Sequence, residues 1–292
     1  MNILISINNK FADLAINMLD SVHLHNADFL NVYLMYSSLT NESISKIKSY
    51  LEDNGIGKLT LMECDFSNVK FPIFIKHISL ETYYRLYAPF LLPKDMDRIL
   101  YLDCDIICNG SIKEFYTTDF ENNIFVGTNN VDPDPMFIKY VCHRLDLPMD
   151  VNYINAGVLL INLPEYRKFA TIKDINQFIK DNAKKLVCQD QDLINKMFYG
   201  KIKSIGDEIN YQINHIELEK LDYDNKKLIH YLSSPKPWQD IYYLPFHGVV
   251  YYRYLINKGK IAQAESLIKK HIENAELNDE EINELNKIIY GK

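Results

Sequence analysis

The sequence predicts an α/β fold in which a mostly parallel sheet is flanked by helices, followed by a C-terminal helical appendage. Short apolar segments alternate with amphipathic ones over residues 2–64, which is the pattern of strands and helices in a parallel sheet. Residues 99–102 are apolar throughout, as in a strand buried on both faces. From about Lys258 onwards apolar residues recur only at helical spacing, which predicts the appendage.

The composition is that of an ordinary globular protein. The chain has 292 residues, of which 47% are hydrophobic and 24% charged, so it can bury a large core. We predict one domain over residues 1–257 and a helical extension over residues 258–292. The net charge of -7 argues against a protein that coats nucleic acid, so no nucleic-acid partner is expected.

Targeting and redox features favour a cytoplasmic protein. The N-terminus has no basic leader and only a short apolar run, and no window approaches about 18 consecutive apolar residues. Neither a signal peptide nor a membrane span is therefore expected. The five cysteines form no Cys-x-x-Cys pair, and their odd number fits reduced thiols packed in the core.

The first 64 residues are expected to form three strands and two helices, and Thr40 or Asn41 should cap the second helix. The strands are predicted at residues 2–7, 29–36 and 59–64, and the amphipathic helices at residues 11–25 and 41–51.

The turn after the first predicted strand, Asn8-Asn9-Lys10, is rich in amides. A dinucleotide-binding fold would place a glycine fingerprint there, but the close glycine pair Gly55-Ile56-Gly57 precedes a strand instead. Asn8 could read a base or a ribose through hydrogen bonds, because it would lie at the carboxyl end of a parallel strand. A plain Asx turn is the alternative.

A helix is predicted from Ser79 and should end near Pro89 or Pro93. Ser79 followed by Thr82 suggests a capped start, and an aromatic stripe should pack on the sheet. Arg85 would lie near the polar edge of that stripe. It is either a solvated helix residue or a ligand for a phosphate or a sugar.

Two carboxylates, Asp103 and Asp105, follow the buried strand, which Ile106 and Ile107 are expected to continue. In extended chain, residues two apart point to the same side, so both carboxylates can converge on one point. Oxygen ligands of this kind suit Mg²⁺ or Mn²⁺, which commonly bind one or two carboxylates together with substrate phosphates. A solvated turn at the end of a strand is the alternative.

The second half of the chain contains two further polar clusters. Asn155-Ala156-Gly157 opens a buried strand with small residues, which would let a ligand approach the backbone. A helix at residues 188–198 begins with Gln189-Asp190-Gln191-Asp192, more polar groups than a cap requires, although the helix dipole favours acids there. The other expected elements are a strand at residues 124–128, a rigid loop at residues 132–135, a strand ending at residue 162 and a helix at residues 175–185.

The run from Leu228 to Trp238 holds two more candidate residues. His230 ends an apolar strand, and a lone histidine there is more often a satisfied core residue than a ligand. Lys236 lies between Pro235 and Pro237, whose rings fix the backbone that aims its charge.

Taken together, these segments resemble glycosyltransferase family 8, whose members are retaining transferases of the bacterial lipopolysaccharide galactosyltransferase and glycogenin type. Each motif alone is weak, but their order also matches, and the resemblance covers about residues 1–245. It implies a GT-A fold, a Rossmann-like sheet with the nucleotide at the carboxyl ends of the first strands. The segments that carry it are residues 77–85, 101–105, 155–162, 189–192 and 230–238.

The resemblance also implies roles for individual residues. Asp103, Asp105 and His230 would hold Mn²⁺, or Mg²⁺, against the diphosphate of a UDP-sugar donor. The implied catalytic residues are Asp190 and Gln191 at the sugar and Lys236 at the leaving diphosphate. The remaining implied donor-binding residues are Asn8, Lys10, His77, Arg85, Cys104, Asn155, Ala156, Gly157 and Ser233.

The chemistry is consistent with these roles. Breaking a glycosyl–phosphate bond leaves negative charge on UDP, which a divalent ion and Lys236 would stabilise. The uncharged oxygen of Gln191 could support positive character on the sugar. An amide is a poor nucleophile, which favours attack from the face that UDP leaves and retention of configuration. Asp192 is the reserve candidate if a covalent intermediate forms.

Several positions depart from the family pattern. Asn8 stands where close relatives often have an acid, Ser233 where glycine is usual, and Cys188 where the galactosyltransferase has an aromatic residue beside the acceptor. Asp132 is only the nearest stand-in for a further family acid. The Tyr251-Tyr252-Arg253-Tyr254 run could touch a membrane-bound acceptor, which would place the protein peripherally at the inner face of the membrane.

We therefore predict a metal-dependent retaining hexosyltransferase that moves glucose or galactose from UDP-glucose or UDP-galactose to a glycan or lipid-linked saccharide. Lipopolysaccharide or polysaccharide biosynthesis is the expected setting. A sugar nucleotidyltransferase is one alternative, but it would normally carry a glycine-rich basic loop after the first strand. A degenerate transferase that binds without turnover is the other, and the presence of the whole implied catalytic set argues against it.

Overall fold

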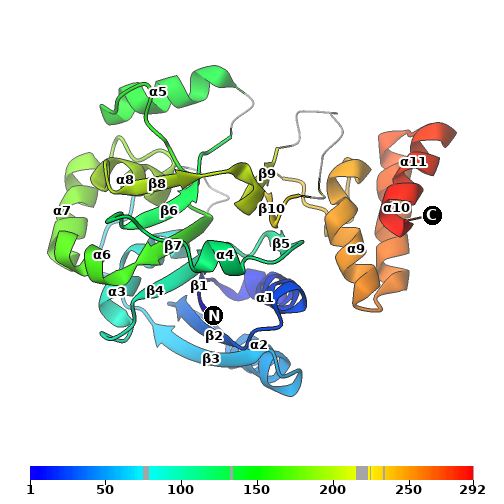
Figure 1. Cartoon of the computed structure of the whole chain (residues 1–292), viewed down its shortest axis with the longest axis horizontal. Helices are drawn as coiled ribbons and strands as arrows, with labels where there is room; N and C mark the ends of the chain where they lie inside the picture. Colours follow the sequence, from blue (N-terminus) through cyan, green and yellow to red (C-terminus); the bar gives the residue numbers. More distant parts are fainter. Residues whose placement is uncertain (75–78, 132–133, 215–222, 224, 233, 292) are drawn as a thin grey trace.

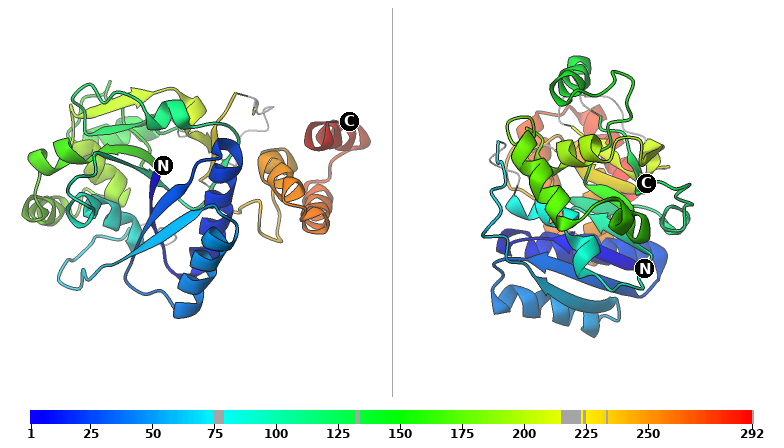
Figure 2. Two further views of the ribbon diagram at one scale, coloured as in Figure 1. Left: turned by 60° about the horizontal axis from the view of Figure 1, so that its bottom comes forward. Right: turned by 90° about the vertical axis from the view of Figure 1, so that its left-hand side faces the viewer.

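A computed structural model of the chain describes residues 1–74, 79–131, 134–214, 223, 225–232 and 234–291 (Figure 1). Within these residues, a seven-stranded sheet has the order β3-β2-β1-β4-β7-β6-β8, and a three-stranded sheet has the order β5-β10-β9. Helices cover both faces of the larger sheet (Figures 1 and 2). The predicted α/β architecture is therefore confirmed.

The N-terminal elements form as the sequence predicts. β1 pairs in parallel with β2 and with β4, and β2 pairs in parallel with β3. Thr40 caps α2 by accepting a hydrogen bond from the Ser43 N–H. The elements are β1 (Asn2–Ser6), α1 (Ala12–Asn26), β2 (Leu30–Tyr36), α2 (Asn41–Asp53) and β3 (Gly57–Glu63).

Alternating side chains of the central strands divide the core between two helical layers. On β1, Ile3 belongs to the apolar cluster that includes α1 and α2, whereas Leu4 belongs to the cluster on the opposite face. β4 (Arg98–Leu102) divides in the same way, with Leu100 on the first face and Tyr101 on the second. Because successive side chains point to opposite faces, an all-apolar strand has to be covered on both.

The strand of residues 99–102 ends before Asp103 as expected, but the expectation that Ile106 and Ile107 continue it is wrong. β4 ends at Leu102, and β5 (Ile106–Cys108) belongs to the smaller sheet, antiparallel to β10 (Leu228–Tyr231). The chain passes from one sheet to the other at Asp103-Cys104-Asp105. The sequence concealed this break because both strands are buried and apolar.

The remaining strands make the larger sheet mixed but mostly parallel. β7 runs antiparallel to both β4 and β6, and β6 pairs in parallel with β8. These strands are β6 (Phe125–Thr128), β7 (Val158–Asn162) and β8 (Ile202–Ile205), and β9 (Tyr211–Ile213) completes the smaller sheet.

Two expectations about helices need correction. Leu80–Leu86 is a 3-10 helix without a side-chain cap from Ser79. It is buried on most of its surface rather than along one stripe, so tertiary packing overrides the amphipathic pattern. Residues 132 and 133 of the predicted loop lie outside the described residues. Pro135, its last residue, instead begins α5 (Pro135–Leu145), because proline suits a first helical position and Asp134 accepts a hydrogen bond from the Met136 N–H.

The other short helices lie between the strands of the larger sheet in sequence. α7 begins earlier than expected because Thr171 and Asp174 form a capping box. These helices are α3 (Ala88–Leu91), α4 (Lys113–Tyr116), α6 (Leu163–Phe169), α7 (Ile172–Asn182) and α8 (Gln189–Met197).

The C-terminal helices α9 (Val249–Asn257), α10 (Ile261–Ala275) and α11 (Asp279–Tyr290) gather at one end of the molecule (Figures 1 and 2). They share an apolar core with β10. The membrane contact expected for the Tyr251-Tyr252-Arg253-Tyr254 run is wrong, because its three tyrosines are buried in this core and Arg253 donates to the Ile288 carbonyl. The domain boundary at residue 257 stays a prediction.

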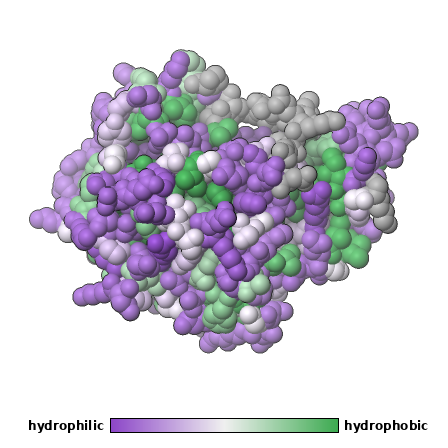
Figure 3. Space-filling model, viewed as in Figure 1, coloured by the Kyte–Doolittle hydropathy of each residue, from purple (hydrophilic) through white to green (hydrophobic). Residues whose placement is uncertain are grey.

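Hydrophilic side chains cover most of the face seen in Figure 3, with smaller apolar patches between them. Among the described residues, no helix has both the length and the apolar character needed to cross a bilayer. All five cysteines are free; Cys188 is partly exposed and the other four are buried, as expected for reduced thiols.

Candidate active site

Asp103, Asp105 and His230 meet where the two sheets join. The aspartates come from the turn after β4, and His230 comes from β10. His230 Nε2 lies 3.1 Å from Asp105 Oδ1 and 3.9 Å from Asp103 Oδ2, and one ligand atom from each residue lies within 4.8 Å of the others. The structure thus brings together the three residues expected to hold a metal.

Gly157, just before β7, makes room for this cluster. A Cβ atom at this position would collide with the His230 ring and lie 2.7 Å from Asp103 Oδ2. The Gly157 carbonyl accepts a hydrogen bond from the Asp103 N–H at 2.8 Å, which holds the two segments together. The close approach of three chain segments explains why this position carries glycine.

The second ring nitrogen of His230 has a fixed partner. Nδ1 lies 3.0 Å from Asn210 Oδ1, and Asn210 Nδ2 donates to Asn155 Oδ1 at 3.0 Å. Because an amide oxygen can only accept, His230 carries a proton on Nδ1, and Nε2 is the ring nitrogen that faces the two carboxylates. Outer partners of this kind orient histidines that bind metals.

Arg85 is buried beside the same cluster, so the expectation that it lies at a polar edge is wrong. Its guanidinium donates to Asp103 Oδ1 at 3.2 Å and lies 3.0 Å from Asp190 Oδ2. It also lies over the Tyr101 ring, with 3.8 Å between Cζ and the ring centroid, and the Tyr101 hydroxyl donates to Asp103 at 2.6 Å. Burying a charged guanidinium away from water is costly unless carboxylates, hydrogen-bond acceptors or aromatic rings compensate its charge.

Asp190 faces Arg85 from the first turn of α8 and is itself buried. Burial raises the pKa of the Asp190 carboxyl to about 6, although the Arg85 guanidinium and a hydrogen bond from Thr82 oppose the rise. Asp190 is therefore more than a cap at a helix N-terminus.

Lys236 directs its ammonium at the other carboxylate of the turn. Nζ lies 2.8 Å from Asp105 Oδ2 and also donates to the Tyr231 carbonyl. Burial would raise the pKa of Asp105, but the Lys236 ammonium and His230 outweigh it and hold this pKa below its ordinary value. The lysine singled out by its two proline neighbours thus lies at the carboxylate cluster.

Gln191 lies beside the turn that leads into β7. Its Oε1 accepts hydrogen bonds from the Ala156 N–H at 3.0 Å and from Asn155 Nδ2 at 3.2 Å. Arg85 donates to the Ala156 carbonyl, so this one residue connects Gln191 with the Arg85 network. The structure therefore brings the predicted sugar-contacting residues to one side of the carboxylate cluster.

Asp192 has a different environment. Its carboxylate accepts hydrogen bonds at 2.7 Å from Arg144, from the Tyr153 hydroxyl and from the Cys188 N–H. It is fully buried, and three donors already bind it. This favours a structural role over that of a reserve nucleophile.

The remaining predicted donor-binding residues differ in position. Asn8 forms the alternative Asx turn, with Oδ1 accepting from the Lys10 N–H at 3.1 Å, and Nδ2 donates to Glu81 Oε2 at 3.2 Å. Lys10 is exposed, whereas Cys104 is buried between the two aspartates. His77, Asp132 and Ser233 lie outside the described residues.

Three residues that complete this network were not anticipated: Tyr101, Glu81 and Asn210. Tyr101 reads as one more core residue of an apolar strand, and Asn210 precedes β9 in a segment without a motif. Glu81 and Tyr101 did lie in segments that carry the family resemblance, residues 77–85 and 101–105, but neither was given a role.

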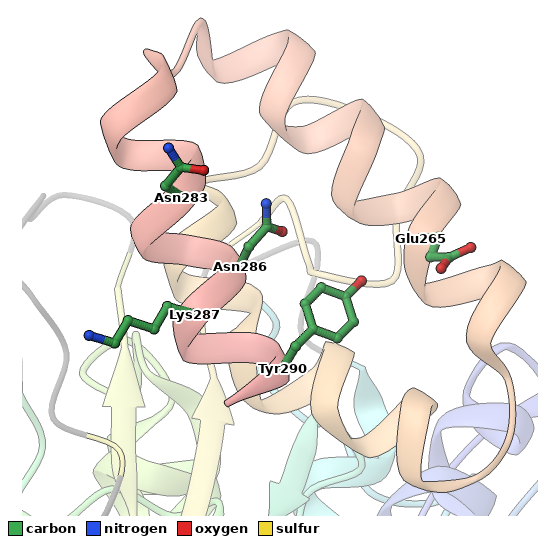
Figure 4. A pocket seen from close by; sticks show the side chains of 5 residues that line it. All are labelled: Glu265, Asn283, Asn286, Lys287 and Tyr290. Atoms are coloured by element: carbon green, nitrogen blue, oxygen red, sulfur yellow. The ribbon is translucent and has the colours of Figure 1, made fainter. Parts of the chain in front are cut away.

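A pocket also lies between α10 and α11, apart from the carboxylate cluster. It is lined by Glu265, Asn283, Asn286, Lys287 and Tyr290 (Figure 4), none of which belongs to the segments singled out above.

Comparison with known proteins defines the class of this protein. The profile of Glycosyl transferase family 8 matches residues 2–242, so the chain belongs to this family. The crystal structure of the galactosyltransferase LgtC with donor and acceptor sugar analogues has a TM-score of 0.70 to this chain at 20% identity, covering 97% of this chain and 99% of LgtC. This likeness confirms the predicted GT-A fold.

Individual relatives cover the chain to different extents. A lipopolysaccharide 1,2-glucosyltransferase from Escherichia coli is 30% identical over 202 residues, which are 65% of this chain and 58% of that protein. Glycosyltransferase GlyA from Streptococcus pneumoniae is 24% identical over 91% of this chain and 36% of its own length. A relative from Haemophilus influenzae is matched over 63% of its length, so the chain spans less than two thirds of each of these three curated relatives.

Proposed function

We propose that the chain is a metal-dependent retaining hexosyltransferase that moves glucose or galactose from a UDP-sugar to a glycan or lipid-linked saccharide. The observation that carries the proposal is that Asp103 and Asp105, which follow β4, meet His230 of β10 in a member of family 8. Two cationic side chains, Arg85 and Lys236, border the same carboxylates. Two relatives named as lipopolysaccharide transferases support a role in lipopolysaccharide or polysaccharide biosynthesis.

The residues at this point fit a divalent ion. Two carboxylates and an imidazole offer ligand atoms within 4.8 Å of one another, and a Cβ at Gly157 would fill the space beside them. Such ligands suit Mn²⁺, and the carboxylates also suit Mg²⁺. The bound ion would supply Lewis-acid neutralisation of the diphosphate leaving group.

Lys236 would hold the departing diphosphate from the side of Asp105. Its ammonium already lies among oxygen acceptors, and the prolines on either side restrict the backbone that carries it. A preorganised cation stabilises the negative charge that develops as the glycosyl–phosphate bond breaks.

The sugar would bind in this proposal against Arg85, Asp190, Gln191 and the 155–157 turn. Contacts from Arg85 to Asp190 and to the Ala156 carbonyl, and from Ala156 to Gln191, support a single preorganised surface. Because the Gln191 amide is a poor nucleophile, the acceptor would approach from the face that UDP leaves, and the linkage would keep the α configuration of the donor.

The donor would be UDP-glucose or UDP-galactose and the acceptor a saccharide. Asn8 would contact the nucleotide through an amide already oriented by Glu81. The five free cysteines support a cytoplasmic location. Residues 1–257 would form the transferase domain, with residues 258–292 as its helical extension.

A thermal-shift panel of UDP, UDP-glucose and UDP-galactose in EDTA and then in Mn²⁺ tests the proposal. A ligand at 100 times its Kd adds about 2.7 kcal/mol, which raises the Tm by about 4–5 °C in a chain of this size. We expect the shift only with Mn²⁺, followed by measurable release of UDP from one donor. Equal shifts in both conditions would contradict metal dependence, and binding without UDP release would indicate a degenerate transferase.

Proton NMR of slow donor hydrolysis, recorded before mutarotation, tests the stereochemistry. The first free sugar should be the α-anomer, and Gln191→Ala should slow its release while leaving UDP affinity nearly unchanged. An initial β-anomer would contradict retention. If Gln191→Ala released the α-anomer at the full rate, the retaining mechanism would stand and only the role proposed for Gln191 would be rejected.

A further inference from the structure

The loop that carries Lys236 is held by one neighbouring residue, Gln239. The Lys236 N–H donates to Gln239 Oε1 at 2.8 Å, and the Gln239 N–H donates back to the Lys236 carbonyl at 3.0 Å. Because Pro235 and Pro237 have no N–H, Lys236 supplies the only backbone donor of residues 235–237. Gln239 thus binds the backbone of Lys236 at both its donor and its acceptor.

Gln239 is held in turn by His271 of α10. His271 is fully buried; its Nε2 lies 3.0 Å from the Gln239 carbonyl oxygen, and its Nδ1 lies beside the Tyr252 hydroxyl. A carbonyl can only accept, so Nε2 carries the proton and Nδ1 accepts from Tyr252. Gly248 leaves space for this arrangement, since a Cβ there would collide with the Tyr252 hydroxyl.

The ammonium of Lys236 is located from the same end of the molecule. It donates to the Tyr231 carbonyl, and the Tyr231 ring packs edge-on against Trp238 at 5.8 Å between centroids. Trp238 lies 5.7 Å from the Tyr251 ring of α9. Both ends of Lys236 are therefore tied to α9 or α10.

We propose that Gln239 and His271 are positioning residues. Through them, α10 holds the backbone of Lys236 where its ammonium can contact the diphosphate of the donor. The proposal rests on the proposed function, because it needs Lys236 to act on that diphosphate. A histidine that only stabilised the core could form its hydrogen bond with any buried acceptor. His271 instead donates to the carbonyl of Gln239, the residue that binds the backbone of Lys236. The helical extension would then support catalysis without touching the substrate.

A double-mutant cycle on Mn²⁺-dependent hydrolysis of UDP-glucose and UDP-galactose tests this role. Lys236→Ala should lower kcat by roughly 10²–10³. Gln239→Ala should lower kcat by roughly 10-fold, the lower end of the usual effect of outer-shell partners, with little change in KM. In the Lys236→Ala background, Gln239→Ala should add less than about twofold, because no lysine is left to position.

Variants of α10 separate positioning from stability. His271→Gln keeps an N–H donor near Nε2 and should retain most of the turnover, whereas His271→Ala should match Gln239→Ala. Lys269→Ala is the matched control, since Lys269 lies near His271 on α10 but pairs with Glu273 of the same helix. It should leave kcat unchanged, and because Gln239 is only partly buried, the Tm of Gln239→Ala should match that of the control.

The outcomes are distinguishable. Equal loss on Gln239→Ala in both backgrounds, or no loss in either, overturns the positioning role while leaving the transferase intact. Full turnover by Lys236→Ala overturns it too, because the lysine would then have no role to support. No UDP release by the wild-type protein overturns the proposed function itself, and with it any role in transfer.

Discussion

The two carboxylates of the Asp103-Cys104-Asp105 turn are held in different ways. Asp103 accepts hydrogen bonds from the Arg85 guanidinium and the Tyr101 hydroxyl, both parts of the packed core. Asp105 is bound by the Lys236 ammonium and lies 3.1 Å from His230 Nε2. The Arg85 side chain is 3% exposed, whereas that of Lys236 is 17% exposed.

Asp103 therefore has a partner that stays in place, whereas Asp105 has a partner that can be exchanged for a ligand. Arg85 presents a planar fork that is always charged, from a segment packed on the sheet, so it orients Asp103 before any ligand binds. Lys236 carries a compact charge on a flexible stem from a loop, so it can leave Asp105 for a ligand. We infer that core residues fix Asp103 and that Asp105 is able to change partners.

The largest effect is expected from removing the fixed partner of Asp103. Arg85→Ala leaves the buried Asp190 and the partly exposed Asp103 without their counter-charge, which should lower the free energy of unfolding by roughly 3–5 kcal/mol in urea denaturation. Arg85→Lys should recover only part of the lost free energy of unfolding, because one ammonium cannot bind both carboxylates at once. Lys46→Ala, which breaks the exposed pair with Asp13, is the control and should cost less than about 1 kcal/mol. A similar cost for Arg85→Ala would contradict the comparison.

The two aspartates should separate binding from stability. Asp105→Asn should weaken UDP binding in Mn²⁺ by roughly 10²-fold or more, the scale expected for losing a metal ligand. Its Tm should fall less than that of Asp103→Asn, because the partly exposed Lys236 ammonium can turn to solvent. Asp103→Asn should lose the same binding and also destabilise the protein by about 1–3 kcal/mol, because Arg85 would lose a charged partner in the core. Calorimetric titration of UDP and thermal denaturation of both variants give the comparison. Equal Tm values for the two variants would contradict the inferred difference between the two aspartates.

The Arg85 network should also impose a pH dependence through Asp190. Its pKa of about 6 means that it gains a proton as the pH falls through 6, so log kcat/KM for donor hydrolysis should fall by about one unit per pH unit below that point. Because this pKa is raised above its ordinary value, the associated stability is present at low pH and lost as the pH rises through 6. Asp190→Asn should abolish both dependences, and an unchanged acid limb in that variant would assign the limb to another group.

The smallest effect concerns the exchangeable partner of Asp105. Without nucleotide, the Lys236 ammonium beside Asp105 repels a metal ion, so Lys236→Ala should raise the affinity for Mn²⁺ by roughly 3–10-fold. Electron paramagnetic resonance of free Mn²⁺ measures this directly, and added salt should reduce the difference. Lys269→Ala serves again as the control. Weaker Mn²⁺ binding by Lys236→Ala would show that the lysine supports the metal site instead of competing with it.

The sequence by itself determined the layered fold and the positions of its polar motifs. Apolar periodicity identified β1, β2 and β3 and their helices, since side-chain spacing is a local property of each element. It also identified Asp103 and Asp105, because carboxylates after a buried strand need an explanation. His230 and Lys236 were singled out in the same way, by a polar group at the end of an apolar strand and by flanking prolines.

Only the tertiary structure decided how these motifs are supported. The break between β4 and β5 is invisible in sequence because both strands are equally apolar, although they join different sheets. The burial of Arg85 depends on Asp103 and Asp190, 18 and 105 positions further along the chain. Likewise Asn210 orients His230 and His271 holds Gln239 through hydrogen bonds between distant segments. Such contacts have no local period, so folding has to bring the partners together before their roles can be read.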